Sequence, residues 1–170
     1  EHYRTSLKSH TEAMWVRKLG LRQSSPGDYY MVAQLDSLLR VVETDMTIFF
    51  RSLGTIDGLN PLDMAHAYYD EAALPVDELG LWLGKWWSRV DGDPDREAMN
   101  NANPKYVLRN WMSQLAIEAA EADDYSVAIE LQDLLRAPYE EQPSSQDRWY
   151  KKRPEWARHK VGCSMLSCSS

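Results

Sequence analysis

The sequence is poor in cysteine, with only Cys163 and Cys168, and both lie among its last eight residues. Two cysteines do not build the disulfide framework of a small secreted protein, so we expect a reducing compartment. They also supply only half of a tetrahedral zinc shell, and no Cys-x-x-Cys or His-x-x-x-His pair supplies the rest. The ending GCSMLSCSS therefore indicates either exposed sulfur chemistry or one half of a pairing whose other half lies elsewhere.

Basic residues and long apolar runs are also scarce. The 19 Lys and Arg are outnumbered by 26 Asp and Glu, which gives a formal net charge of −7. An acidic chain is a poor general binder of nucleic acid, because that affinity depends on cations that neutralise phosphates. No apolar run reaches the roughly 18 residues of a membrane span, and the start EHYRTSLKSH lacks the layout of a signal peptide. We therefore expect neither nucleic acid nor a membrane as a partner.

Motifs that bind phosphate or activate a nucleophile are absent. The eight glycines form no Gly-x-Gly-x-x-Gly and no Gly-x-x-x-x-Gly-Lys-Ser/Thr pattern. The triplets His-Arg-Asp and Asp-Phe-Gly and the elbow Gly-x-Ser-x-Gly are missing too. Asp63 and His66 are spaced like half of a carboxylate-bridged metal site, but no Glu-x-x-His partner occurs. The sequence thus predicts no catalytic, cofactor-binding or metal-binding residue within this chain.

What the sequence does have is helical periodicity. With 170 residues and 44% hydrophobic residues, the chain is long enough for a packed core. Apolar residues recur three and four positions apart, and no useful strand-like alternation appears, so we predict an all-α fold of six or seven helices. The stretches GTIDGLNPLD, DGDPDRE and YEEQPSSQD are rich in turn formers and predict connections. The expected helices cover about 3–19, 28–42, 45–53, 75–90, 103–119 and 124–135.

Two helical segments carry specific expectations. The stretch LGLWLGKWWSRV either presents tryptophan faces to a ligand or contributes them to the core, and the helical spacing favours the core. Further on, Asn103 followed by Pro104 predicts an N-cap and a first helical residue. On the buried face of that helix, Trp111 and Leu115 are predicted to pack against Leu131 and Leu135 of the next helix. The same buried face is predicted to include Leu108, Met112 and Ala119.

The stretch RWYKKRPEWARHK is basic within an acidic chain. It is either a solvated face, the more common outcome, or a contact for a phosphate or an acidic partner. Its cations are also expected to raise the thiolate fraction of nearby cysteines. They are Arg148, Lys151, Lys152, Arg153, Arg158 and Lys160.

Several strings together resemble a known family. NANPKYVLRNWMSQLAIEAAEADDYSVAIELQDLLRAPYEEQP, then KKRPEWARHK and a terminal SCSS, resemble the end of the selenoprotein O (YdiU) family. MWVRKLGL and TDMTIFFRSLG are similar to the same family just upstream, while residues 55–100 match more loosely. The resemblance covers nearly the whole chain in the right order.

The resemblance implies a fold and an activity. Members of the family are kinase-like proteins that bind ATP in an inverted pose and transfer AMP to protein hydroxyls. The family's nucleotide lysine, its glutamate partner and its metal-binding residues lie N-terminal to this region, so ATP and Mg²⁺ are implied for a full-length parent only. Residues 1–143 would then be a helical C-lobe-like domain, and residues 144–170 a basic, cysteine-containing tail. The chain alone would be inactive, with the parent's N-terminal nucleotide-binding part and its protein substrates as partners.

The resemblance also gives Cys168 a role. In the family the third residue from the end is selenocysteine or cysteine, and it is thought to pair with a cysteine near the activation segment. Cys163 is outside that pattern, which leaves the pairing open between these two redox candidates. The compartment would be cytoplasmic in a bacterium and mitochondrial in a eukaryote.

A second hypothesis makes the chain a free-standing helical interaction module without nucleotide chemistry. The reading frame upstream of Glu1 distinguishes the two. A glycine-rich loop and an Asp-Phe-Gly-like triplet there would support the enzyme, and a start codon directly before Glu1 would support the module.

Overall fold

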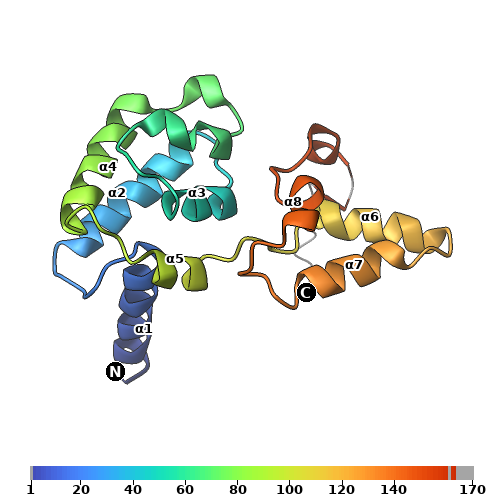
Figure 1. Ribbon diagram of the computed structural model, residues 1–170, viewed down its shortest axis with the longest axis horizontal. Coiled ribbons are helices and arrows are strands. Elements are labelled where there is room, and N and C mark those ends of the chain that lie inside the picture. Colours follow the sequence, from blue (N-terminus) through green and yellow to red (C-terminus); the bar gives the residue numbers. More distant parts are fainter. Residues whose placement is uncertain (1, 161, 164–170) are drawn as a thin grey trace. The chain divides into compact units, whose positions relative to one another are not determined.

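A computed structural model describes residues 2–160, 162 and 163, with side chains from residue 6 onward. Within these residues the protein has eight α-helices, three 3₁₀ helices and no strand, which confirms the all-α prediction (Figure 1). The predicted count of six or seven was slightly low, because two short helices lie in stretches expected to be connections. None of the described helices is long and apolar enough to cross a membrane. The elements are α1 (His2–Lys18), α2 (Asp28–Val41), α3 (Met46–Leu53), η1 (Pro61–Ala67), η2 (Glu71–Ala73), α4 (Val76–Arg89), α5 (Arg96–Ala102), α6 (Asn110–Glu121), α7 (Ser126–Leu134), α8 (Pro143–Trp149) and η3 (Glu155–Arg158).

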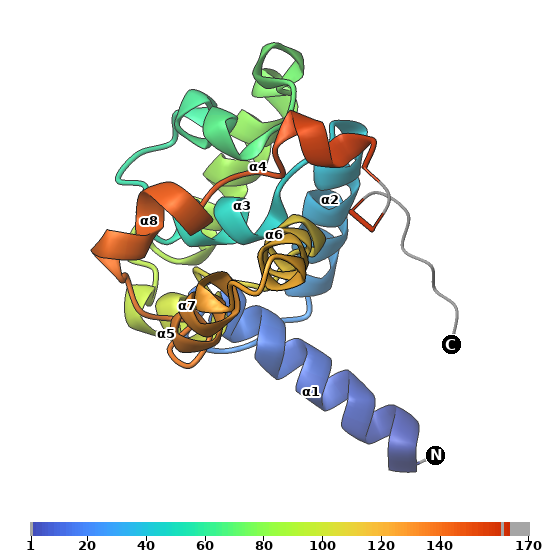
Figure 2. The ribbon, with the colours of Figure 1, turned by 90° about the vertical axis from the view of Figure 1, so that its right-hand side faces the viewer.

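The chain forms two compact units, Glu1–Asn103 and Pro104–Ser170. In the first unit α1 projects away from α2, α3 and α4, and its residues 6–14 are exposed (Figure 2). The rest of this unit packs α2 against α4 and α3 against η1.

Two of the three tryptophans of α4, Trp82 and Trp86, belong to the core of the first unit, as their spacing predicted, and Trp87 is half-buried. Trp82 and Trp86 are buried and stacked, with ring centroids 6.3 Å apart and an interplanar angle of 4°. Their indole N–H groups donate to backbone carbonyls, from Trp82 to Met31 and from Trp86 to Leu19. Burial of a large apolar ring is favourable when its single polar atom finds such a partner.

The expected helix start at Asn103 was wrong, because α6 begins at Asn110. Asn103 is instead the buried residue that ends α5: its Oδ1 accepts from the Lys18 ammonium, and its Nδ2 donates to the Lys18 carbonyl. Proline disfavours helical dihedrals in the residue before it, and Asn103 is extended. The amides of Lys105 and Tyr106 both donate to the Pro138 carbonyl, so a tertiary contact outweighs the local helix signal.

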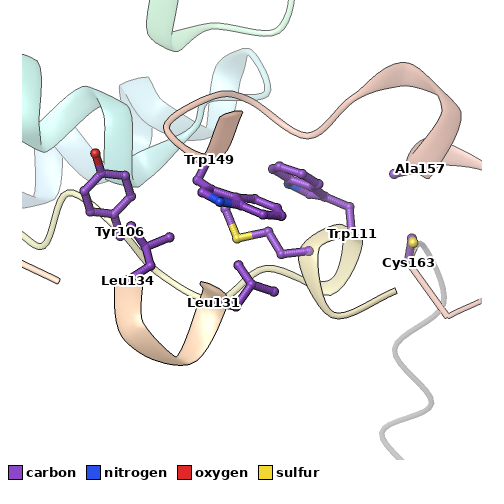
Figure 3. Close-up of a cluster of buried hydrophobic side chains, with 8 residues drawn as sticks. Tyr106, Trp111, Leu131, Leu134, Trp149, Ala157 and Cys163 are labelled. Carbon is purple, nitrogen blue, oxygen red and sulfur yellow. The ribbon is translucent and has the colours of Figure 1, made fainter. Parts of the chain in front are cut away.

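The second unit contains the α6–α7 hairpin. Trp111 and Leu131 are buried as predicted, whereas Leu115 and Leu135 are half-buried at the edge of the same cluster. Leu108, which was expected on the buried face, is 52% exposed because it precedes the helix. The cluster shown in Figure 3 also takes side chains from the C-terminal segment. Its buried members are Tyr106, Trp111, Met112, Leu131, Leu134, Trp149, Ala157 and Cys163.

The stretch expected to be a linker contains the start of α8, which brings Trp149 into this cluster. The two compact units meet between Asn103 and Pro104, and the predicted domain boundary between residues 143 and 144 stays a prediction. Residues 144–160 pack within the second unit through Trp149 and Ala157.

Candidate functional site

The string NPKYVLRNW covers residues 103–111, and its residues from Pro104 onward belong to the second unit, where Lys105 and Tyr106 contact the C-terminal segment. Lys105 is only 5% exposed, and its ammonium donates to Glu141 Oε2 at 2.6 Å and to Gln146 Oε1 at 2.8 Å. The same nitrogen lies 5.0 Å from the ring centroid of Tyr150. A buried ammonium is tolerated only when several acceptors replace its water. Lys105 therefore joins the loop before α8, α8 itself and the residue that follows it.

Tyr106 holds the same loop at its backbone. Its hydroxyl lies 2.8 Å from the carbonyl oxygen of Glu141 and 3.1 Å from that of Gln142. Gln142 has a φ of 39°, in the left-handed region, and its side-chain amide donates to the carbonyls of Leu134 and Ala137. The bond network around this loop holds a backbone conformation that a non-glycine residue rarely adopts.

Trp111 and Trp149 stack in the cluster, with centroids 5.8 Å apart and an interplanar angle of 26°. The Trp149 indole N–H donates to Glu130 Oε1 at 2.7 Å, and Arg148 donates to the other oxygen of the same carboxylate at 2.5 Å. Glu130 lies on α7, so this carboxylate connects α7 with the end of α8. These contacts position the C-terminal segment and supply no nucleophile or proton donor for a substrate.

Of the two cysteines, Cys163 lies within the described residues and Cys168 lies outside them. Cys163 is a free thiol that is 5% exposed, so the exposed sulfur chemistry expected of the tail does not apply to it. Its carbonyl accepts a hydrogen bond of 3.4 Å from Asn110 Nδ2.

The basic stretch finds acidic partners within the chain. Arg148 pairs with Glu130, Arg158 with Glu155, and Lys160 with Glu118. These pairs are partly exposed, and surface ion pairs contribute little individually. Three of the cations that suggested an acidic partner are thus paired with carboxylates of the second unit itself.

The candidate half-site for a metal has other contacts. His66 Nε2 and Ser52 Oγ share a hydrogen bond of 2.7 Å, and Asp63 accepts one from Asn60. Across the part of the chain that the structure describes, no three His, Cys, Asp or Glu side chains gather where they could hold a metal ion.

One arrangement was not predicted from the sequence. Asn110, Gln114 and Glu118 are spaced four residues apart and so share one line along α6. We call these three residues the polar row. The spacing was visible in the sequence, but nothing in it indicated that the C-terminal residues lie along this line.

Comparison with known proteins shows which family the chain resembles. It is 45% identical over 171 residues to the protein nucleotidyltransferase YdiU of Flavobacterium johnsoniae, a match that covers 92% of this chain and 32% of that protein. The resemblance to the YdiU family is confirmed. Proteins with the same name from Aromatoleum aromaticum and Azoarcus sp. strain BH72 are 42% and 43% identical, over 92% and 94% of the chain.

The chain spans about a third of the length of these YdiU relatives. Models of known protein families give no match. The relatives are named protein nucleotidyltransferases, and the string NPKYVLRNW, in which Lys105 and Tyr106 are buried, lies within the shared region in this chain.

Proposed function

We propose that this chain is the helical C-terminal part of a YdiU-like protein nucleotidyltransferase with a kinase-like fold. Its identity of 42–45% with proteins of that name, over more than nine-tenths of its length, is the observation that supports this most. In the full-length protein, a Ser, Thr or Tyr hydroxyl oxygen of a substrate protein would attack the α-phosphorus of ATP. The new ester carries AMP, and pyrophosphate leaves.

The ATP–Mg²⁺ site is assigned to the N-terminal nucleotide-binding part of the same protein, which is the main partner of this chain. The contacts of Lys105, Tyr106 and Trp111 support a positioning role here, because they hold the loop before α8 and the segment after it in place. On this view the chain by itself is inactive.

The position of the label on ATP tests the reaction. Full-length protein, incubated with Mg²⁺ and a protein acceptor, should transfer label from α-labelled ATP and none from γ-labelled ATP. Transfer of the γ-label would identify a phosphoryl-transferring kinase instead. Transfer of neither label, together with a start codon directly before Glu1, would support the free-standing interaction module.

The isolated chain provides the second test. Calorimetry should detect no ATP–Mg²⁺ binding to it, whereas full-length protein should bind. A micromolar dissociation constant for the chain, or about −8 kcal/mol, would contradict the assignment of the nucleotide site to the other part of the protein.

We further propose that Cys168 is the redox-sensitive residue of the full-length enzyme. The burial of Cys163 supports this, because a thiol without access to solvent reacts slowly with disulfides. Activity should differ between reduced glutathione and glutathione disulfide in the wild type and in Cys163→Ser, and should no longer differ in Cys168→Ser. Loss of the difference in Cys163→Ser alone would assign the role to the other sulfur.

A further inference from the structure

The polar row of α6 meets the C-terminal segment at three points. Asn110 donates to the Cys163 carbonyl, and Glu118 forms an ion pair with Lys160. Between them, Gly162 passes so close to Gln114 that a Cβ on it would lie 2.7 Å from Oε1. The contacts follow opposite orders along the two segments, so the C-terminal residues lie antiparallel to α6. We call residues 155–160, 162 and 163 the strap.

The strap also has two buried side chains. Ala157 has no exposed area and Cys163 has 5%, and both belong to the cluster around Trp111 and Met112 (Figure 3). Gly162 has a φ of 88°, in the left-handed region that favours glycine. This turn places the Cys163 side chain in the cluster and its carbonyl toward Asn110.

At the end of the polar row farthest from Asn110, Glu118 holds the strap through its ion pair with Lys160. The pKa of the Glu118 carboxyl lies below its usual value, first because Lys160 donates a hydrogen bond to it and second because Gln114 does. Gln114 Nε2 lies 2.9 Å from Glu118 Oε1, so the amide holds the carboxylate toward Lys160. Both members of the ion pair are more than a third exposed, so salt screens the attraction between them.

The contacts that Asn110 and Glu118 make with the strap lie near the surface, and surface contacts of this kind are typical of a segment that opens without global unfolding. We propose that the strap is a releasable element that docks on the polar row, buries the Cys163 thiol when docked and exposes it when released. The polar row positions the strap through its two ends, Asn110 and Glu118. This inference concerns contacts within the second unit and does not depend on the proposed nucleotidyl transfer.

Thiol labelling of the Cys168→Ser chain tests the proposal, because Cys163 is then its only cysteine. An aromatic disulfide reagent should label Cys163 about 100-fold more slowly in the native chain than in denaturant, which corresponds to roughly 2.7 kcal/mol for opening. In that background, Glu118→Gln and Asn110→Ala should each raise the native rate several-fold. Glu121→Gln, a change at an exposed glutamate of the same helix, should leave it unaltered.

Two further measurements separate strap release from general loosening. Added salt should raise the labelling rate when Glu118 is intact and should have little effect in Glu118→Gln. The rate should also rise less steeply with urea than global unfolding measured by tryptophan fluorescence. Native labelling as fast as in denaturant, equal rates in Glu118→Gln and Glu121→Gln, or a urea dependence equal to that of global unfolding would each overturn the proposal.

Discussion

The ammonium of Lys105 lies 2.6 Å from a carboxylate oxygen of Glu141, although Lys105 is buried and Glu141 is mostly exposed. The pair thus connects the extended segment before α6 with the loop before α8, and Gln146 supplies a second acceptor from α8. A string of the sequence that resembles a family signature therefore has a structural role in this chain. It holds the C-terminal segment on the hairpin.

The first prediction follows from this pair. Lys105→Met keeps most of the side-chain length but removes both hydrogen bonds that the ammonium donates. Each hydrogen bond to a charged group stabilises a protein by roughly 1.5–3 kcal/mol. The exposed Glu141 carboxylate regains water, so we expect a net loss of about 1–3 kcal/mol in the free energy of unfolding. Urea denaturation followed by tryptophan fluorescence measures it.

Lys85→Met is the matched control for this change. Lys85 is exposed and its ammonium donates to Gln34 Oε1 at the surface, so its loss should change stability by less than about 0.5 kcal/mol. Equal effects at the two lysines would mean that Lys105 contributes no more than a surface charge.

Helical periodicity predicted those parts of the fold in which one face of a helix meets the core. Trp82 and Trp86 are buried, and so is Leu131, because apolar residues at this spacing fall on one face whatever their partner is. The turn signals were weaker evidence: α8 begins at Pro143, inside a stretch expected to be a linker. Proline at the first turn fits either a linker or a helix start, and tertiary packing of Trp149 decides between them.

Sequence reasoning failed where long-range contacts override local preference. Asn103 and Pro104 form a good helix start on their own, but the chain stays extended so that Lys105 and Tyr106 bond to the Pro138 carbonyl. Cys163 was placed in an exposed tail because chain ends are usually solvated. Its side chain is instead buried in the cluster of the second unit, and the contacts of this segment with Asn110, Gln114 and Glu118 join residues far apart in the sequence, which a local pattern cannot predict.

The second prediction concerns the core of the hairpin. Leu134 is 2% exposed within the cluster, so Leu134→Ala leaves a cavity and should cost about 2–5 kcal/mol. Ile129→Ala, on the same helix but 57% exposed, should cost less than about 0.5 kcal/mol. Leu115→Ala should lie between them, because Leu115 is half-buried. Chemical denaturation of the three variants checks this order, and a reversed order would show that the phase of the hairpin helices is wrong.

The third prediction concerns two glycines of the first unit. Gly20 has a φ of 64°, and a Cβ there would lie 2.8 Å from Met99 Sδ and 3.0 Å from the Asp95 nitrogen. Gly20→Ala should therefore destabilise the unit by about 1–3 kcal/mol. Gly27 has a φ of −73° and no atom within 4 Å of such a Cβ, so Gly27→Ala should be neutral or stabilising by up to about 1 kcal/mol. Thermal melts followed by circular dichroism compare the two, and equal melting temperatures would contradict the close approach at Gly20.

The last prediction concerns alkaline stability and Tyr68, which has no exposed area. Burial raises the pKa of Tyr68 to about 12, and a hydrogen bond with Thr44 offsets only part of that shift. An unfolded tyrosine ionises near pH 10, so above that pH the unfolded state loses this proton while the folded state keeps it. The stability that Tyr68 contributes is therefore complete below about pH 10 and is lost as pH rises toward 12.

Between pH 9 and pH 12, Tyr68→Phe should lose about 2 kcal/mol less in unfolding free energy than the wild type. Urea denaturation at both pH values measures the difference, in which the other titrating groups cancel, and an equal loss in both proteins would mean that Tyr68 ionises in the folded state as it does in water.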